Sequence, residues 1–554
     1  MKRFRAALIA AVVATASGPA FAADSYQSLV KLWRDWRAFQ PPAVQDCVPD
    51  YSAAAMAQKA GRLEEFQAKL AAIDAKGWTK ARLVDRKIVA AEMNGMDFDM
   101  RVLKPWARDP SFYATVFGEE SDVPEHEGPN AYPAIDLYTY KYPLSKKDQK
   151  RLTCLIGAVP ALLEQAKANL EGSNARDLWV YGDRAFRWQD EALAALAAGT
   201  LDMRTLEGNV RGTLEGAGPE LVAAVTSARA ATADFRKWLK EEAPSKTGEA
   251  GVGKENYDWY MKNVLLSPYG WDEQATLLRR ELERARASLA LEEFKNRDLP
   301  PMKSFDEESA YLEMARAKMS ALADFLIDNG LVDDKSYFRD ALANEVGAFT
   351  PPEERNFFSI GSAFDPSPLY SHFYHWIELA MRKHEPVKSP IRAATPLYDM
   401  YDGRSEGMAT AVEELFMQAG LYEDSPRSRE IVWIMLANRA ARGLASLYAQ
   451  SNDMSLDEAG KFHASWTPRK WSDASSDLVG FEQLLYLRQP GYGTSYITGK
   501  LELDRLVSEY AYEREQKGEA FSLPEFFDNL NASGVIPFAL IGEDMTDGPL
   551  KAGE

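Results

Sequence analysis

Apolar residues recur along most of the chain at the spacing of an amphipathic α-helix. In residues 61–78, one face carries Leu63, Phe66, Leu70 and Ile73, and charged residues lie between them. A stripe with a period near 3.6 residues is typical of a helix that packs one face on a core. We therefore predict a helix over this segment.

The same period governs several longer segments. It is seen in residues 155–172, 220–242, 272–297 and 429–450. Strand-like alternation is scarce, and its best example is the short run 535–541, VIPFALI. The pattern predicts a mainly α fold, a large single helical body with at most a small sheet.

Loops rich in Pro, Gly and Asn separate the predicted helices, and the most extended of them covers residues 242–256. We predict one helical domain over residues 23–554. Whether it is undivided or consists of two lobes around a central cleft, residues 23–245 and 257–554, is open at this stage.

The first 22 residues have the features of a secretory signal. Lys2, Arg3 and Arg5 are followed by a short apolar run and by the small-residue site Ala20-Phe21-Ala22. The run is shorter than the roughly 20 apolar residues that cross a bilayer. We predict a periplasmic or secreted protein with no membrane span.

The charge of the chain limits its partners. The formal net charge is −18, and removal of residues 1–22 makes it −21. Nucleic acids call for clustered Lys and Arg, and anionic lipid surfaces call for basic segments. We expect neither nucleic acid nor membrane as a partner, and a small molecule or peptide as the substrate.

Only two cysteines are present, Cys47 and Cys154. In an oxidising compartment they can pair, but sequence alone does not decide whether they meet. Two cysteines are too few for a cysteine-rich zinc module. Any metal site must therefore use histidine and carboxylate ligands.

Three of the five histidines fall within residues 371–385. We expect one helix here, capped by the side chain of Ser367 and with Pro368 at its first helical position. Its predicted core-facing stripe is Leu369, Phe373, Trp376 and Ala380. His126, by contrast, lies in the polar loop DVPEHEGPN, which we expect at the surface.

Two of those histidines have the spacing of metal ligands. His372 and His375 lie at i and i+3, with Glu378 at i+6, so both imidazoles can point at one ion. The alternative is that one histidine bonds a buried polar group and the other lies at the surface. Sequence spacing alone does not separate the two.

A second amphipathic helix is predicted over residues 404–420. Glu406 and Glu413 share one of its faces. A carboxylate from this helix and two histidines from the previous one would make a His₂Glu zinc set. The alternative is that Glu406 lies near a helix start because the helix dipole favours an acid there.

Several motifs occur together in a recognisable order. They are Gly253–Tyr257, Glu406-Gly407-Met408-Ala409 with Glu413, Arg439-Ala440-Ala441-Arg442, Glu482 with Tyr486, and Pro490-Gly491 through Ser495-Tyr496 to Gly499. In this order the chain resembles the bacterial "domain of unknown function 885" family, relatives of helical zinc metallopeptidases. The resemblance runs through most of the mature chain and is clearest after about residue 350.

The resemblance implies a zinc-dependent hydrolase of peptides or other amide-like small substrates. The implied metal ligands are His372, His375 and Glu406. The implied catalytic groups are Glu378 or Glu413 as proton acceptor and Tyr496 as donor to the oxyanion. The implied substrate contacts are Arg439, Arg442 and Tyr492.

The departures from the family pattern affect the chemistry. With His372 at the first family histidine, Phe373 stands where the general-base glutamate belongs. Ser446 and Gln450 replace an aspartate and a histidine, and Leu485 replaces an arginine. Phenylalanine accepts no proton, so the usual base is missing. The chain is therefore either a rewired hydrolase or a pseudoenzyme that binds a periplasmic ligand or partner.

Overall fold

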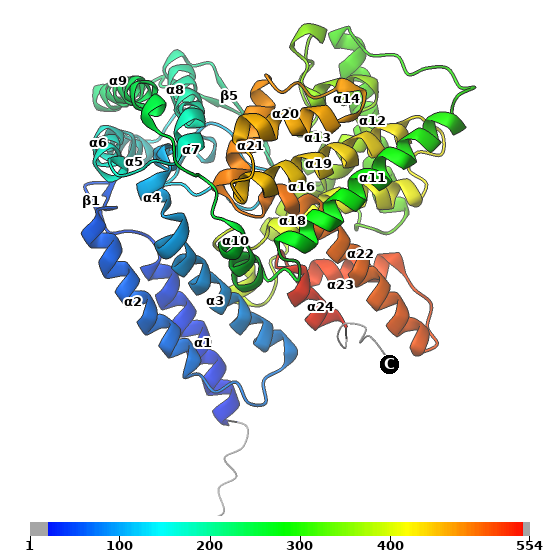
Figure 1. Cartoon of the computed structure of the whole chain (residues 1–554), viewed down its shortest axis with the longest axis horizontal. Coiled ribbons are helices and arrows are strands. Elements are labelled where there is room, and N and C mark those ends of the chain that lie inside the picture. Colours follow the sequence, from blue (N-terminus) through cyan, green and yellow to red (C-terminus); the bar gives the residue numbers. More distant parts are fainter. Residues whose placement is uncertain (1–19, 547–554) are drawn as a thin grey trace, which may run out of the picture.

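The computed structural model describes residues 20–546 and consists mainly of helices (Figure 1). Strands form three two-stranded sheets, which join β1 (Val44–Gln45) to β2 (Val48–Pro49), β3 (Val116–Phe117) to β4 (Ile135–Asp136), and β5 (Leu201–Thr205) to β6 (Gly208–Gly212). The predicted mainly α class with at most a small sheet is confirmed. The predicted signal peptide, residues 1–22, lies almost entirely outside the described residues.

The first half of the chain contains these helices: α1 (Ala20–Phe39), α2 (Ala53–Ala71), α3 (Lys80–Phe98), α4 (Pro105–Arg108), α5 (Lys146–Gly157), α6 (Val159–Leu170), α7 (Arg176–Tyr181), α8 (Asp183–Ala198), α9 (Pro219–Glu242), α10 (Lys254–Tyr260) and α11 (Trp271–Lys295). A turn of π-helix, Asp99–Leu103, extends α3. Within residues 20–546, no helix combines the length and the apolarity that crossing a membrane requires.

The second half contains α12 (Glu308–Asp328), α13 (Ser336–Ala343), α14 (Phe357–Phe364), α15 (Ser367–His372), α16 (Tyr374–His384), α17 (Pro390–Ala393), α18 (Asp402–Gln418), α19 (Ser428–Gln450), α20 (Leu456–Trp466), α21 (Asp477–Arg488), α22 (Tyr492–Gln516), α23 (Leu523–Ala532) and α24 (Phe538–Met545). Helices α18, α19 and α22 pack on one another and are buried around much of their surface, polar side chains included.

The interior divides into two main apolar clusters. The smaller joins side chains between Tyr51 and Leu239, chiefly from α5 to α9. The larger joins α1, α2 and α3 to the helices after residue 252. These three N-terminal helices lie side by side (Figure 1), and their apolar side chains pack in the same cluster as the C-terminal helices, although α5 to α9 come between them in the sequence.

The two cysteines form a disulfide in the structure. Cys47 lies in the turn between β1 and β2, and Cys154 lies on α5. The pairing that the sequence left open is therefore present. It ties the segment between α1 and α2 to a helix of the smaller cluster.

Three local predictions are wrong for identifiable reasons. The run 535–541 is not a strand, because helix α24 begins just after Pro537. The stripe over 155–172 is interrupted at Ala158 and continues as α6, with Pro160 in its first turn. Ile73 lies beyond the end of α2 at Ala71. In each case the apolar pattern was clear, but other residues determined the type of element or the position at which the helix ends.

The histidine segment also departs from its prediction. Ser367 is the first residue of α15 and not its cap; the Asp365 carboxylate accepts a hydrogen bond from the Ser367 backbone N–H, at 2.9 Å. The expected single helix is broken at Phe373 into α15 and α16. Leu369 and Phe373 of the predicted stripe are only partly buried. The expectation of one buried face fails because helices surround this segment, so its polar face is buried as well.

Glycines bring α18 and α22 into backbone contact. A Cβ atom on Gly407 would lie 2.4 Å from the Cα atom of Gly499, far inside van der Waals distance. Only hydrogen side chains permit this approach. The contact fixes Glu406, next to Gly407, against the first turns of α22, from which Tyr492 and Tyr496 project.

Candidate functional site

The three predicted metal ligands lie together in the structure. His375 Nε2 is 3.2 Å and His372 Nε2 is 3.5 Å from the same oxygen of Glu406, Oε2. One donor atom from each of the three residues lies within 4.8 Å of the other two. Ligands about 2.0–2.1 Å from a tetrahedral zinc ion are about 3.3 Å apart, so this spacing suits such an ion.

Burial and charge act in opposite directions on this cluster. Burial alone would lower the pKa of His375, but the Glu406 carboxylate beside it outweighs burial and raises that pKa to about 9. Burial likewise would raise the pKa of Glu406, and the two imidazoles hold it well below its usual range. The carboxylate is therefore ionised and attracts a cation.

A second layer of polar groups orients the ligands. The Glu413 Oε1 atom lies 3.0 Å from His372 Nδ1, and Arg439 donates to Glu413 Oε2 at 2.7 Å. Arg439 also lies 3.1 Å from His372 Nδ1 and can only donate to it, so in this arrangement Nδ1 accepts. Metal binding through Nε2 would use the other tautomer, in which Nδ1 carries the proton and donates to Glu413. Tyr492 donates its hydroxyl proton to the other oxygen of Glu406.

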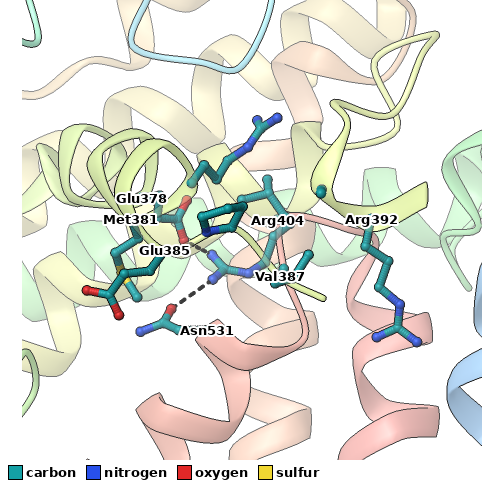
Figure 2. A pocket seen from close by; sticks show the side chains of 12 residues that line it. Glu378, Met381, Glu385, Val387, Arg392, Arg404 and Asn531 are labelled. Atoms are coloured by element: carbon teal, nitrogen blue, oxygen red, sulfur yellow. Dashed lines mark hydrogen bonds and ion pairs between the residues drawn. The ribbon is translucent and has the colours of Figure 1, made fainter. Parts of the chain in front are cut away.

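The carboxylates predicted to accept a proton are both occupied by arginines. Figure 2 shows the Glu378 side chain directed at Arg404, which also donates to Asn531 at 3.3 Å. These residues line a cavity of about 40 Å³, which the other predicted site residues do not line. Glu413, as described, is held by Arg439. Neither carboxylate is free to approach a substrate in this structure.

Tyr496 lies beside the histidine pair. Its ring is nearly parallel to that of His372, with centroids 6.2 Å apart, and the Arg442 guanidinium lies 4.1 Å from its centroid. Burial and the nearby Glu406 raise the pKa of Tyr496 well above its usual value. The hydroxyl is therefore neutral and able to donate.

The predicted substrate contacts are engaged with protein groups. Arg439 pairs with Glu413, Arg442 with Glu482, and Tyr492 with Glu406. All three side chains are buried. The structure brings them to the site, where they hold its carboxylates, and their contact with a substrate stays a prediction.

One residue at the site was missed by the sequence interpretation. Glu127, in the loop taken as polar surface, lies 2.8 Å from the Tyr492 hydroxyl. Because that hydroxyl gives its single proton to Glu406, the second contact is a hydrogen bond when a protonated Glu127 donates to the phenol oxygen. Burial and the nearby Asp122 raise the pKa of Glu127 to about 8. The only hint in the sequence was an acid within a Pro-Gly loop, because its partners lie hundreds of residues away.

The loop around Glu127 is fixed by the end of α21. Gly128 donates its backbone N–H to Gln489 at 2.7 Å, and Arg488 donates to the carbonyl of Pro129, also at 2.7 Å. Through these bonds a loop of the N-terminal half covers helices of the C-terminal half. His372 and Tyr496 keep only 8% and 7% of their surface exposed, so the site is nearly closed.

Two solved structures are similar to the chain over almost its whole length. One is a protein from Shewanella oneidensis described as a candidate lipoprotein of unknown function, with 12% identity and a TM-score of 0.61 over 94% of this chain and 98% of that one. The other, from Colwellia psychrerythraea and also described as a candidate lipoprotein, has 13% identity and a TM-score of 0.62 over 95% and 98%. At these identities the likeness shows the fold alone. No curated protein matches the chain significantly in sequence.

A family model described as "bacterial protein of unknown function (DUF885)" matches residues 38–326, more than half of the chain. The match ends before the histidine segment, whereas the motifs that carry the metal prediction lie mostly after residue 350. The link to zinc peptidases therefore stays a prediction, while the family itself is confirmed. The chain belongs to the bacterial family of unknown function DUF885.

Proposed function

We propose that the protein is an exported, metal-dependent hydrolase of a peptide or other amide-like small substrate. The observation that carries the proposal is the convergence of His372, His375 and Glu406, with nitrogen-to-oxygen distances of 3.2 and 3.5 Å. Two imidazoles and one carboxylate are a donor set that suits zinc. A bound zinc ion would polarise the substrate carbonyl as a Lewis acid.

The remaining steps fall to side chains of this chain. The neutral Tyr496 hydroxyl would donate to the carbonyl oxygen as negative charge develops on it. Glu127 fits the role of proton acceptor from the attacking water better than Glu378 or Glu413, because no arginine among the described residues pairs with it. Its pKa, about 8, is close to neutrality, as a general base requires. The proton would then pass to the leaving amine.

Export is part of the same proposal. The predicted signal peptide and the Cys47–Cys154 disulfide both suit an oxidising compartment outside the cytoplasm. The two structural neighbours described as candidate lipoproteins are in keeping with an exported fold.

Metal binding by untagged protein tests the proposal. After chelation and dialysis, calorimetric titration with zinc should give about one equivalent per chain. His375→Ala and Glu406→Gln should abolish this binding, and His384→Ala, at an exposed histidine, should leave it unchanged. No zinc binding by the folded wild-type chain would refute a metal-dependent reaction.

Activity is tested on the zinc-loaded chain with a mixed library of short amidated peptides. We expect cleavage by the wild type and its loss in Glu127→Gln at full zinc content. General-base removal typically costs about 10²–10⁴-fold in rate.

A second candidate function has its own support. Because arginines hold Glu378 and Glu413 and the site is nearly closed, the chain also suits a protein that binds its ligand without turnover. This alternative predicts that ligand affinity survives chelation. The hydrolase proposal predicts that turnover is lost on chelation.

A further inference from the structure

A large cavity lies between the two apolar clusters, apart from the histidine pair. Its volume is about 410 Å³, within the usual range for sites of small organic ligands. Its wall includes Phe112 of the smaller cluster and Tyr260 of the larger, and the loop 125–134 forms one side. Tyr132 on that loop is 47% exposed, which places the loop at the solvent side.

The wall carries carboxylates that no cation pairs with directly, although Arg488 near Asp399 and the cations near Glu125 (His126, Arg382 and Arg37) offset part of the rise in pKa. Asp99, Glu125 and Asp399 all line the cavity, and none of them forms an ion pair among the described residues. Burial and the neighbouring acids raise the pKa of Asp99 well above its usual range, and that of Asp399 to about 7. The three acids are close enough to repel one another.

The one cationic side chain in the wall other than histidine is already engaged. Lys59 donates to the backbone carbonyls of Phe39, at 3.1 Å, and of Pro41, at 2.8 Å. Burial lowers its pKa to about 8. It therefore caps a helix end and does not neutralise the acids.

A buried hydroxyl in the wall lies near one of these acids. Tyr401 is 1% exposed, and its OH group is close enough to Asp399 to lower the pKa of that carboxyl, but it completes no hydrogen bond of standard length and angle. A ligand atom could complete one, which would remove an unfavourable buried polar contact. Aromatic rings, among them Trp106 and Phe112, complete the wall.

We propose that this cavity binds an organic cation, an alkylammonium or guanidinium group on an aliphatic body. The carboxylates of Asp99, Glu125 and Asp399 would face the charge, and the aromatic rings would cover the body and add cation–π attraction. A bare metal ion fits less well, because the described residues bring three metal-donor groups within reach of one ion only at His372, His375 and Glu406.

The proposal does not depend on the metal site, and its test uses the full chain with no metal added. The charged probes are cadaverine, for a free diamine, and N-acetylarginine amide, for a basic side chain of a peptide. The uncharged control is 1,5-pentanediol, which has the same carbon chain as cadaverine. Binding is measured by titration calorimetry in about 150 mM salt, because salt screens weak attraction between the cations and the acidic surface.

We expect saturable binding of at least one of the two cations and no binding of the diol. The cation that binds more tightly tells whether the ligand is a free diamine or the basic side chain of a peptide. Asp399→Asn should weaken binding about tenfold, a change of about 1.4 kcal/mol. Asp457→Asn, at an exposed acid elsewhere, and His375→Ala should both retain wild-type affinity.

A second cavity variant protects the test against misfolding. Glu125 is exposed on its loop, so Glu125→Gln should fold normally and should also weaken binding. Absence of binding by either cation, equal binding of the diol, or wild-type affinity in a folded Asp399→Asn or Glu125→Gln chain would overturn the proposal.

Discussion

The two site histidines differ in what their second ring nitrogen meets. His372 Nδ1 lies 3.0 Å from Glu413, whereas Nδ1 of His375 is buried without a hydrogen-bond partner. Both Nε2 atoms face the same oxygen of Glu406. The two histidines are thus held by the carboxylates of α18, Glu406 for both and Glu413 for His372 alone. These contacts explain how His372 and His375 converge although the helix breaks between them.

Glu502 on α22 offers a test of electrostatics away from the site. Its carboxylate accepts from Ser267 at 3.2 Å, and burial raises its pKa to about 7. Because the folded pKa is above the ordinary value, the protonated form is favoured in the folded chain. Its contribution to stability is complete below about pH 4.5 and is lost as the pH rises to about 7.

Glu502→Gln should therefore stabilise the protein at pH 8, where the buried charge is absent from the variant. We expect a gain of about 1–2 kcal/mol and a Tm about 2 °C higher, with no gain at pH 5. Glu515→Gln, at an exposed position of the same helix, is the matched control. Equal effects at the two pH values would contradict the assigned pKa.

At the scale of elements, the contact between α18 and α22 depends on glycine. In Gly407→Ala the new methyl group meets the backbone at Gly499, which cannot move aside as a flexible side chain could. Overpacking of this kind costs about 1–3 kcal/mol or more. We expect a lower Tm by thermal denaturation and weaker zinc binding, since the variant separates Glu406 from Tyr492.

Gly403 provides the control within the same helix. A Cβ atom there would meet nothing within 4 Å. Gly403→Ala should therefore stabilise α18 by about 0.5–1 kcal/mol, the usual gain for alanine over glycine in a helix. Equal shifts in Tm from Gly407→Ala and Gly403→Ala would contradict a role for Gly407 in the close approach of α18 and α22.

The elements that sequence reasoning could predict are those with a regular apolar stripe, whether one face is buried, as in α9 and α11, or nearly the whole helix, as in α19. The stripes over residues 220–242, 272–297 and 429–450 correspond to α9, α11 and α19. The histidine segment was harder, because helices bury it on all sides and its polar face carries no sign of exposure. His372, His375 and Glu406 could be found from spacing and motif order, whereas Glu127 reaches the site only through a loop contact that no local pattern encodes.

At the scale of the whole molecule, the Cys47–Cys154 disulfide fastens the connection between α1 and α2 to α5. That connection also contacts the smaller cluster, because Gln165 of α6 donates to the Pro49 carbonyl and Tyr51 packs in that cluster. The bridged residues are 107 positions apart. Closing so long a loop restricts the unfolded chain strongly, so native disulfides of this kind typically contribute about 2–4 kcal/mol.

A double variant, Cys47→Ser with Cys154→Ser, should therefore unfold at a Tm about 3 °C lower than the oxidised wild type. Dithiothreitol should lower the Tm of the wild type toward that of the variant and leave the variant unchanged, which separates loss of the bridge from an effect of the serines. Since the bridge holds the β1–β2 turn on α5, limited proteolysis of the variant should also cut first near residues 44–49. Equal melting of variant and oxidised wild type would mean that packing alone holds this turn in place.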